Sequence, residues 1–286
     1  MSIIDTAFVN QFSANVAMLS QQMETKLRKA VDVESVTGEK AFFEQIGEAV
    51  AVERTSRNAD TPLVATPHAR RMVTMSDFEH AVLIDDQDKV RMLIDPTSAY
   101  SKAAAGAMAR KMDDVIIAAA TGDAKTGKDG NTTTSLPSSQ KIAHGSAGLT
   151  LAKLLEAKKK LDANNVDPSI QRFIVCSPEQ VEDLLNNTTV TSADFNTVRA
   201  LVAGNIDQFV GFTFIQSNRL ATDSNGHRKV FAFATDGIKL AIGKEPTAKI
   251  TERPDKSYAT QVYYCQTIGC TRMEESKVVE IACSES

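Results

Sequence analysis

The sequence predicts an α+β fold, in which helices and strands occupy separate stretches of the chain. An alanine-rich stretch from Asp95 to Gly122 carries apolar residues at the spacing of a long helix. The last third of the chain consists instead of short runs that alternate in the manner of strands. No regular alternation of strand, helix and strand links these segments, so a parallel α/β fold is not expected.

The composition is that of an average soluble intracellular protein. The chain has 286 residues, of which 42% are hydrophobic and 24% are charged. Its 32 Lys and Arg against 36 Asp and Glu give a net charge of −4, which argues against a dedicated polyanion-binding protein. No apolar run approaches the ~18 residues of a membrane span, and the N-terminus lacks the basic region of a secretory signal. We expect reduced, buried thiols at the four cysteines, which are Cys176, Cys265, Cys270 and Cys283.

The first forty residues are expected to form an arm rather than part of the core. Apolar residues recur there at spacings of three and four, which predicts one stripe of an amphipathic helix over residues 8–27. The stripe consists of Phe8, Phe12, Val16, Leu19, Met23 and Leu27. A terminal helix with so narrow an apolar stripe needs another surface to lie on, within its own subunit or on a neighbour.

Residues 46–95 are predicted to contain a long two-stranded hairpin. Strand-like alternation occurs at 48–53 and again at 71–75, and a polar, turn-rich tip at 54–68 separates the two runs. An isolated two-stranded ribbon is marginal in water. Since this ribbon has few large apolar residues, we expect it to pack on another subunit.

The strongest helix prediction starts after Asp95 and ends at Gly122. Such a helix has about 25 residues and a length of ~37 Å at 1.5 Å per residue. Its predicted apolar face consists of Tyr100, Ala104, Met108, Met112, Val115 and Ala119. A helix of this length suggests a rigid structural element.

Further helices and strands follow in no regular order. We predict a polar loop, a helix and a buried strand at 122–148, 149–164 and 173–176 respectively. A helix is predicted to start at Ser177, which can cap its N-terminus. Pro178 then occupies the first helical position, and Gln180 stands three residues after the serine. The remaining strands are predicted at 209–215, 230–234, 237–242, 248–253, 260–270 and 278–283.

One motif is formally similar to a nucleotide-binding loop. Residues 122–128 match G-x-x-x-x-G-K, but Asp129 stands where a P-loop has the Ser or Thr that binds magnesium. A helix precedes the motif, where a P-loop has a strand. We therefore predict a flexible loop here, without nucleotide binding.

The other chemistry-bearing residues form no recognisable site. Isolated surface histidines are expected at His68, His80, His144 and His227, because none lies three or four residues from another His or Cys. Lysines 158–160 are predicted to lie on a solvated helix face, with an anion contact as the alternative. No nucleophile elbow or dinucleotide-binding motif occurs. The sequence thus predicts no catalytic residue, no cofactor, no metal and no enzyme.

Four stretches, taken in order, carry a likeness to a known family. The predicted long helix reads YSKAA at 100–104 and RKMDDVI at 110–116, and RFIVCSP at 172–178 precedes a Leu-rich helix. VGFTFIQSNRL at 210–220 is an apolar strand after Gly with a polar turn and Leu behind it. The chain closes with GCTRM at 269–273 and VVEI at 278–281.

This ordered set resembles the major capsid proteins of tailed bacteriophages. The resemblance implies an HK97-like capsid fold with an N-arm, an extended β-hairpin loop (E-loop), a long spine helix, and peripheral and axial domains. By that likeness the N-arm is 1–40, and the E-loop with its preceding segment is 41–95. The peripheral domain holds 96–148 and 254–286, and the axial domain holds 149–253.

The resemblance also implies a structural function. The protein is expected to assemble as hexamers and pentamers into an icosahedral head around double-stranded DNA, bound without sequence specificity. Since only about forty residues precede the E-loop, a separate scaffolding protein is expected, besides a portal protein; a decoration protein is left open. The chain would be assembled in the host cytoplasm and found in the virion, without a membrane partner. An encapsulin-like bacterial compartment is the alternative, ahead of a soluble enzyme or a tail or portal component.

Some capsids of this fold join a loop Lys to an Asn of a neighbour. This chain has no Lys between Ala41 and Asp88 and no Asn at 253–258, so we expect no covalent crosslinking. Non-covalent contacts between subunits are expected instead from Phe8, Phe12 and Leu19 of the arm, and from Arg54, Arg57, Arg70 and Arg71 of the loop.

Overall fold

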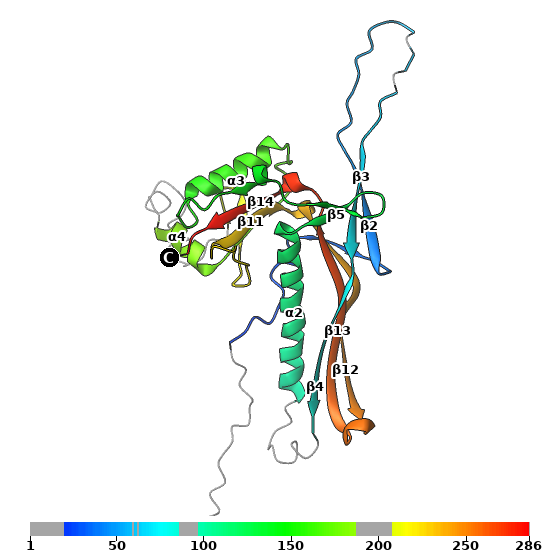
Figure 1. The fold of residues 1–286 in the computed structure, drawn as a ribbon, viewed down its shortest axis with the longest axis vertical. Coiled ribbons are helices and arrows are strands. Elements are labelled where there is room, and N and C mark those ends of the chain that lie inside the picture. The colour runs from blue at the N-terminus through cyan, green and yellow to red at the C-terminus, as the bar shows by residue number, and fades with distance from the viewer. Residues whose placement is uncertain (1–19, 59, 62, 86–96, 187–207, 286) are drawn as a thin grey trace, which may run out of the picture. The chain divides into compact units, whose positions relative to one another are not determined.

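The computed structural model describes residues 20–58, 60–61, 63–85, 97–186 and 208–285, which Figure 1 shows as a ribbon. Contacts divide the chain into two compact units. Unit 1 consists of Met1–Thr25, Asp77–Lys111 and Lys244–Thr267, and unit 2 of Lys26–Ser76, Met112–Gly243 and Ile268–Ser286. Both units contain helix and strand, as the α+β prediction requires.

A six-stranded sheet forms the centre of unit 2, in the order β7-β14-β11-β8-β10-β9. Its strands are β7 (Lys141–Ile142), β8 (Arg172–Cys176), β9 (Gln208–Phe209), β10 (Phe212–Gln216), β11 (Arg228–Ala234) and β14 (Val278–Cys283). β8 pairs in parallel with β10 and antiparallel with β11. All five residues of β8 are buried. The strands predicted at 173–176, 230–234 and 278–283 are confirmed.

Two helices of unit 2 also agree with the prediction. Helix α3 (Leu151–Ala163) contacts β14 and β7 of the sheet (Figure 1). Helix α4 (Pro178–Asn186) follows β8 directly. Its predicted start is confirmed, because the Gln180 side-chain oxygen accepts a hydrogen bond from the Ser177 N–H at 2.9 Å.

A second sheet of unit 2 has the order β2-β3-β5-β6, and all its pairs are antiparallel. The strands are β2 (Lys40–Ile46), β3 (His68–Thr74), β5 (Ala124–Thr126) and β6 (Thr132–Thr134). β2 and β3 form the predicted hairpin, but the first strand lies earlier than predicted, because the ladder ends near Pro67. The Gly47 N–H donates to the Pro67 carbonyl at 2.8 Å, and proline has no N–H to continue the pairing. Residues 48–53 form no strand.

Residues 122–148 are not a polar loop throughout, as the sequence predicts, but contain regular elements. They form the β5–β6 hairpin, a short 3-10 helix η2 (Ser138–Gln140) and β7. Gly130 in the β5–β6 turn has φ +69°, and a Cβ there would meet the Met72 side chain. The P-loop-like residues 122–128 therefore lie on an antiparallel strand and its turn, and the strand β6 rather than a helix is the next element after them.

The remaining strands are β1 (Asp32–Ser35), β4 (Ser76–Ile84), β12 (Ile238–Arg253) and β13 (Ala259–Arg272), in the order β1-β12-β13-β4. The sequence prediction misses β1 and β4. It also divides β12 into two strands, whereas one strand runs through Pro246. β1 pairs only with residues 239–242 of β12.

Helix α2 (Thr97–Thr121) confirms the predicted long helix, with 25 residues. Ala104 and Met108 are buried in unit 1, and Met112 and Ile116 in unit 2. The apolar face is shifted relative to the prediction, because Ile116 and Ala120 are buried rather than Val115 and Ala119. No helix in the described ranges is long and apolar enough to cross a membrane.

The described end of the predicted arm helix is not helical. Residues 8–19, including Phe8, Phe12 and Leu19, lie outside the described part of the chain. Residues 20–30 form turns and bends. The Lys26 and Leu27 N–H groups donate to the Asp113 carboxylate at 3.0 and 3.2 Å, instead of to carbonyls of a helix.

A buried ion cluster joins several elements of unit 2. Arg272 is fully buried, and its guanidinium donates to the Ala120, Gly122 and Thr134 carbonyls at 3.2, 2.6 and 3.1 Å. Burial lowers the pKa of Arg272, and the Glu275 carboxylate, 3.6 Å from its Nε, opposes that shift. Arg71 of β3 binds the same carboxylate at 2.6 Å. The last carbonyls of α2 are thus capped by a side chain from β13.

We predict that Arg272→Met lowers the free energy of unfolding by about 3–5 kcal/mol, because it leaves three buried carbonyls without a donor and removes one of the two guanidinium groups that face Glu275. Urea titration of the subunit measures this. The matched control Arg253→Met removes an exposed pair with Asp255 and should cost about 0–1 kcal/mol. Equal losses for the two variants would contradict a structural role for the cluster.

Candidate functional site

The segment between β2 and β3, residues 47–67, is named the hairpin loop here. Figure 1 shows it extending away from the two strands. Its described residues form no helix or strand. Several large apolar side chains are nevertheless exposed: Leu63 is 98% exposed and Val50 is 66% exposed, and Val52 and Val64 are also exposed. A surface with such residues is typical of a segment that packs on another molecule.

The predicted contact arginines fall into two groups. Arg54 and Arg57 lie on the hairpin loop and are exposed. Arg54 donates to the Ser56 carbonyl at 2.9 Å. No carboxylate within the described ranges pairs with either residue, so both are accessible to a partner.

Arg70 and Arg71 have partners within their own chain. Arg70 donates to Glu44 at 2.7 Å and lies 5.3 Å from the centre of the Phe42 ring. Arg71 is buried, and it donates to the Met273 carbonyl at 2.8 Å and to Glu275. These bonds fix the base of the hairpin loop to its own subunit. Arg71 is therefore shielded from a neighbour by its burial, although its Nη1 has no hydrogen-bond partner among the described residues.

Two histidines are not isolated, contrary to the sequence prediction. The rings of His144 and His227 stack with 3.8 Å between centroids. His227 Nδ1 lies 3.0 Å from Asp223, and hydrogen bonds from His227 lower the pKa of Asp223 to about 2. The residues are 83 positions apart, so spacing along the chain gave no signal. They meet because β7 and β11 belong to one sheet.

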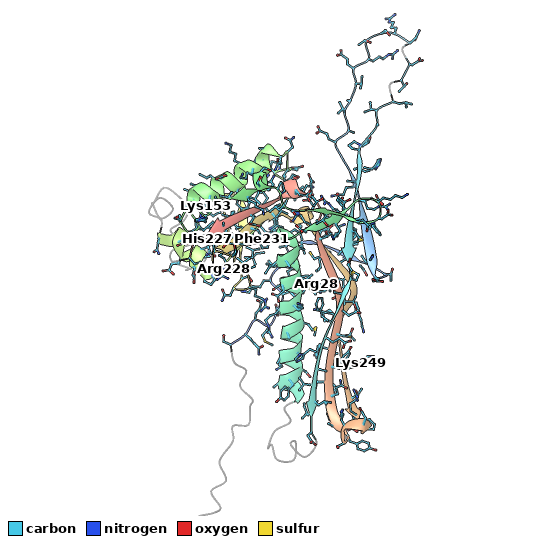
Figure 2. The ribbon with its side chains drawn as sticks, viewed as in Figure 1. Arg28, Lys153, His227, Arg228, Phe231 and Lys249 are labelled. Carbon is cyan, nitrogen blue, oxygen red and sulfur yellow. The ribbon has the colours of Figure 1, made fainter. Side chains whose placement is uncertain are left out.

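A cluster of charged groups surrounds the same end of the sheet. Figure 2 shows Lys153, His227 and Arg228 there. The Lys153 ammonium donates to four backbone carbonyls, those of His144, Ala147, Gly148 and Ala282, at 2.7–3.1 Å. Arg228 holds Glu285 with two bonds of 2.7 Å, which lower the pKa of Glu285 to about 2. These contacts hold the C-terminal segment and the loop before α3 in place.

The cysteines behave as the sequence predicts. All four are free thiols, and three are buried. Burial raises the pKa of both Cys176 and Cys283 to about 12. They are therefore thiols rather than reactive thiolates at neutral pH. The described residues contain no group of three His, Cys, Asp or Glu that could hold a metal ion.

Solved capsid structures have the same fold. The capsid of the cyanophage P-SCSP1u matches with a TM-score of 0.78 at 19% identity, over 99% of this chain and 95% of that chain. The capsid of Ralstonia phage GP4 matches with a TM-score of 0.75 at 10% identity, over 100% of this chain and 98% of that chain. A chain of Mycobacterium phage Che8 matches with a TM-score of 0.69 at 17% identity, over 96% of this chain and 97% of that chain. No curated protein sequence matches.

The long helix, the hairpin and the six-stranded sheet thus have the fold of phage capsid proteins. The chain belongs to the phage capsid protein family, whose model matches residues 4–285. The sequence-based resemblance is confirmed at this level.

Proposed function

We propose that this chain forms the hexamers and pentamers of an icosahedral phage head around double-stranded DNA. The hairpin loop supports this most strongly, because its exposed apolar side chains have no core of their own. Burying one Val or Leu on a neighbour contributes about 1.5–3 kcal/mol. Each copy would thus gain stability from the copy that receives its hairpin loop.

The proposed partners follow from the same role. We propose assembly in the host cytoplasm with a separate scaffolding protein and a portal protein. The net charge of −4 suits a container for DNA, since a strongly basic wall would hold the packaged DNA tightly. Arg54 and Arg57 remain our proposed polar contacts to neighbouring carboxylates.

We also propose the family's division of the chain, with one adjustment. The N-arm is 1–40, the E-loop segment is 41–95, and the peripheral domain includes the long helix. β7 and β14 share a sheet with β8, β10 and β11. We therefore assign both to the axial domain rather than to the peripheral domain.

The hairpin loop gives a direct test of assembly. We expect the purified chain, alone or with its scaffolding protein, to form capsomers or shells visible by negative-stain microscopy. Val50→Ser with Leu63→Ser should abolish them without changing the melting temperature of the subunit, because both side chains are exposed. A matched control, Leu155→Ser, changes an exposed leucine of α3 and should assemble normally. Normal shells from the loop variant would contradict the proposal.

Our second proposal is that the mature shell is held without covalent bonds. The hairpin loop lacks a lysine, and guanidinium groups cannot replace a lysine amine as nucleophile. Mature particles heated in denaturant with reductant should therefore give one gel band near 30.9 kDa. A ladder of multimers surviving this treatment would overturn the proposal.

A further inference from the structure

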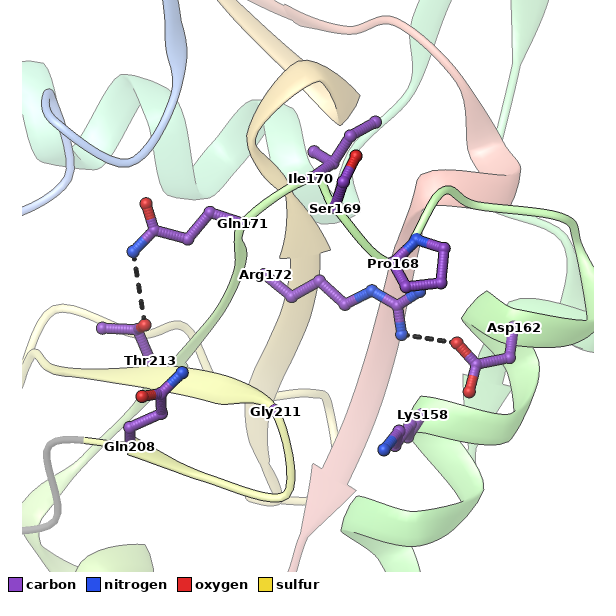
Figure 3. A pocket seen from close by; sticks show the side chains of 10 residues that line it. All are labelled: Lys158, Asp162, Pro168, Ser169, Ile170, Gln171, Arg172, Gln208, Gly211 and Thr213. Carbon is purple, nitrogen blue, oxygen red and sulfur yellow. Dashed lines mark hydrogen bonds and ion pairs between the residues drawn. The ribbon is translucent and has the colours of Figure 1, made fainter.

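A pocket of about 620 Å³ opens where β8 begins, beside α3 and the β9–β10 turn (Figure 3). Lys158, Asp162 and Arg172 are its charged residues. Figure 3 shows Lys158 beside Gly211 of the turn, and a Cβ on Gly211 would lie 4.0 Å from the lysine Nζ. Lys158 and the turn therefore line the same pocket.

The pocket carries one positive charge that its own residues do not neutralise. Arg172 donates to Asp162 at 2.6 Å, which occupies the nearest carboxylate. Within the described ranges, no carboxylate pairs with Lys158. Arg172 is 6% exposed, and its buried Nε has no hydrogen-bond partner among the described residues. The sequence prediction of a solvated face at 158–160 is therefore incomplete at Lys158, which is half-buried.

The turn that borders the pocket is strained. Val210 has φ +54° and Gly211 has φ +83°. A β-branched residue in the left-handed region is an outlier that costs free energy. Two left-handed residues in succession suit a two-residue hairpin turn. This turn holds the rim of the pocket in one conformation.

An acidic surface lies at the opposite end of β8, where α4 begins. Glu179, Glu182 and Asp183 of α4 are exposed. The Glu285 carboxylate raises the pKa of Glu179 through like-charge repulsion. β8 has five residues, so the acidic surface and the pocket lie ~16 Å apart at 3.3 Å per residue. One subunit therefore presents a basic site and an acidic site at the two ends of one sheet.

We propose that the basic pocket of one copy receives Glu179 and Glu182 of a second copy. This inference rests on the proposed function, and it assigns the residues of one contact between copies. Because the two surfaces differ, the contact is head-to-tail and builds a ring if the rotation between copies closes. Exposed ion pairs contribute about 0–1 kcal/mol each. Their main effect is to set which faces meet and in which orientation.

A second copy suits the pocket better than nucleic acid does. The pocket has a net charge of only +1, whereas nucleic-acid binding relies on several Lys and Arg side chains that neutralise successive phosphates. Its amide and apolar lining, with Gln171, Gln208 and Ile170, suits the end of a peptide helix. Both complementary surfaces are also present on every copy.

The test exchanges the charges of the two surfaces. Sedimentation velocity measures pairwise association of the variants, and negative-stain microscopy shows whether they form shells. Lys158→Glu should weaken association about tenfold, because like charges then face each other. Glu179→Lys with Glu182→Lys should do the same. The triple variant should restore association to within about threefold of the unaltered chain. Lys159→Glu is the matched control on the same helix, outside the pocket lining, and should leave association unchanged.

Circular dichroism melts establish that each variant is folded. A folded Lys158→Glu variant that associates like the unaltered chain would overturn the contact, as would a folded triple variant that does not recover. Loss of association in the Lys159→Glu control to the same degree would also overturn it, because net charge alone would explain the effect. If the variants change pairwise association as expected but neither they nor the unaltered chain form shells, the contact between copies is supported and the proposed function is wrong.

Discussion

The buried cluster of Arg71, Glu275 and Arg272 is the interaction on which the rest of unit 2 depends. Two guanidinium groups share one carboxylate, and Arg272 also binds the carbonyls that end α2. One set of contacts therefore fixes the base of the hairpin, the end of the long helix and the end of β13. Because buried charges are costly when unpaired, each member constrains the positions of the others.

This anchoring explains how the hairpin loop can be apolar and still belong to a folded subunit. The six-stranded sheet, with its fully buried β8, supplies the core. The described residues of the loop lie outside that core, and its base is held by the Gly47–Pro67 bond and by Arg70 and Arg71. Its apolar side chains are thus available to a neighbour, as a shell of repeated subunits requires.

The sequence predicted the parts that local rules control and missed those that depend on distant partners. The alanine content and the helical spacing of apolar residues were enough to predict α2. Ser177, Pro178 and Gln180 were enough to predict where α4 starts. The strand at 48–53 was wrong because pairing, not alternation, decides a strand, and the ladder ends at Pro67. The His144–His227 stack and the Arg272 cap join residues more than 80 positions apart, which no spacing rule reveals.

The central claim is that the hairpin loop is exposed in the free subunit and covered by a neighbour in the shell. Hydrogen exchange, compared peptide by peptide between subunit and shell, tests this most directly. Peptides from residues 47–67 should exchange rapidly in the free subunit and slow markedly on assembly, while β8 stays protected in both states. Equal, rapid exchange of the loop in subunit and shell would contradict the account.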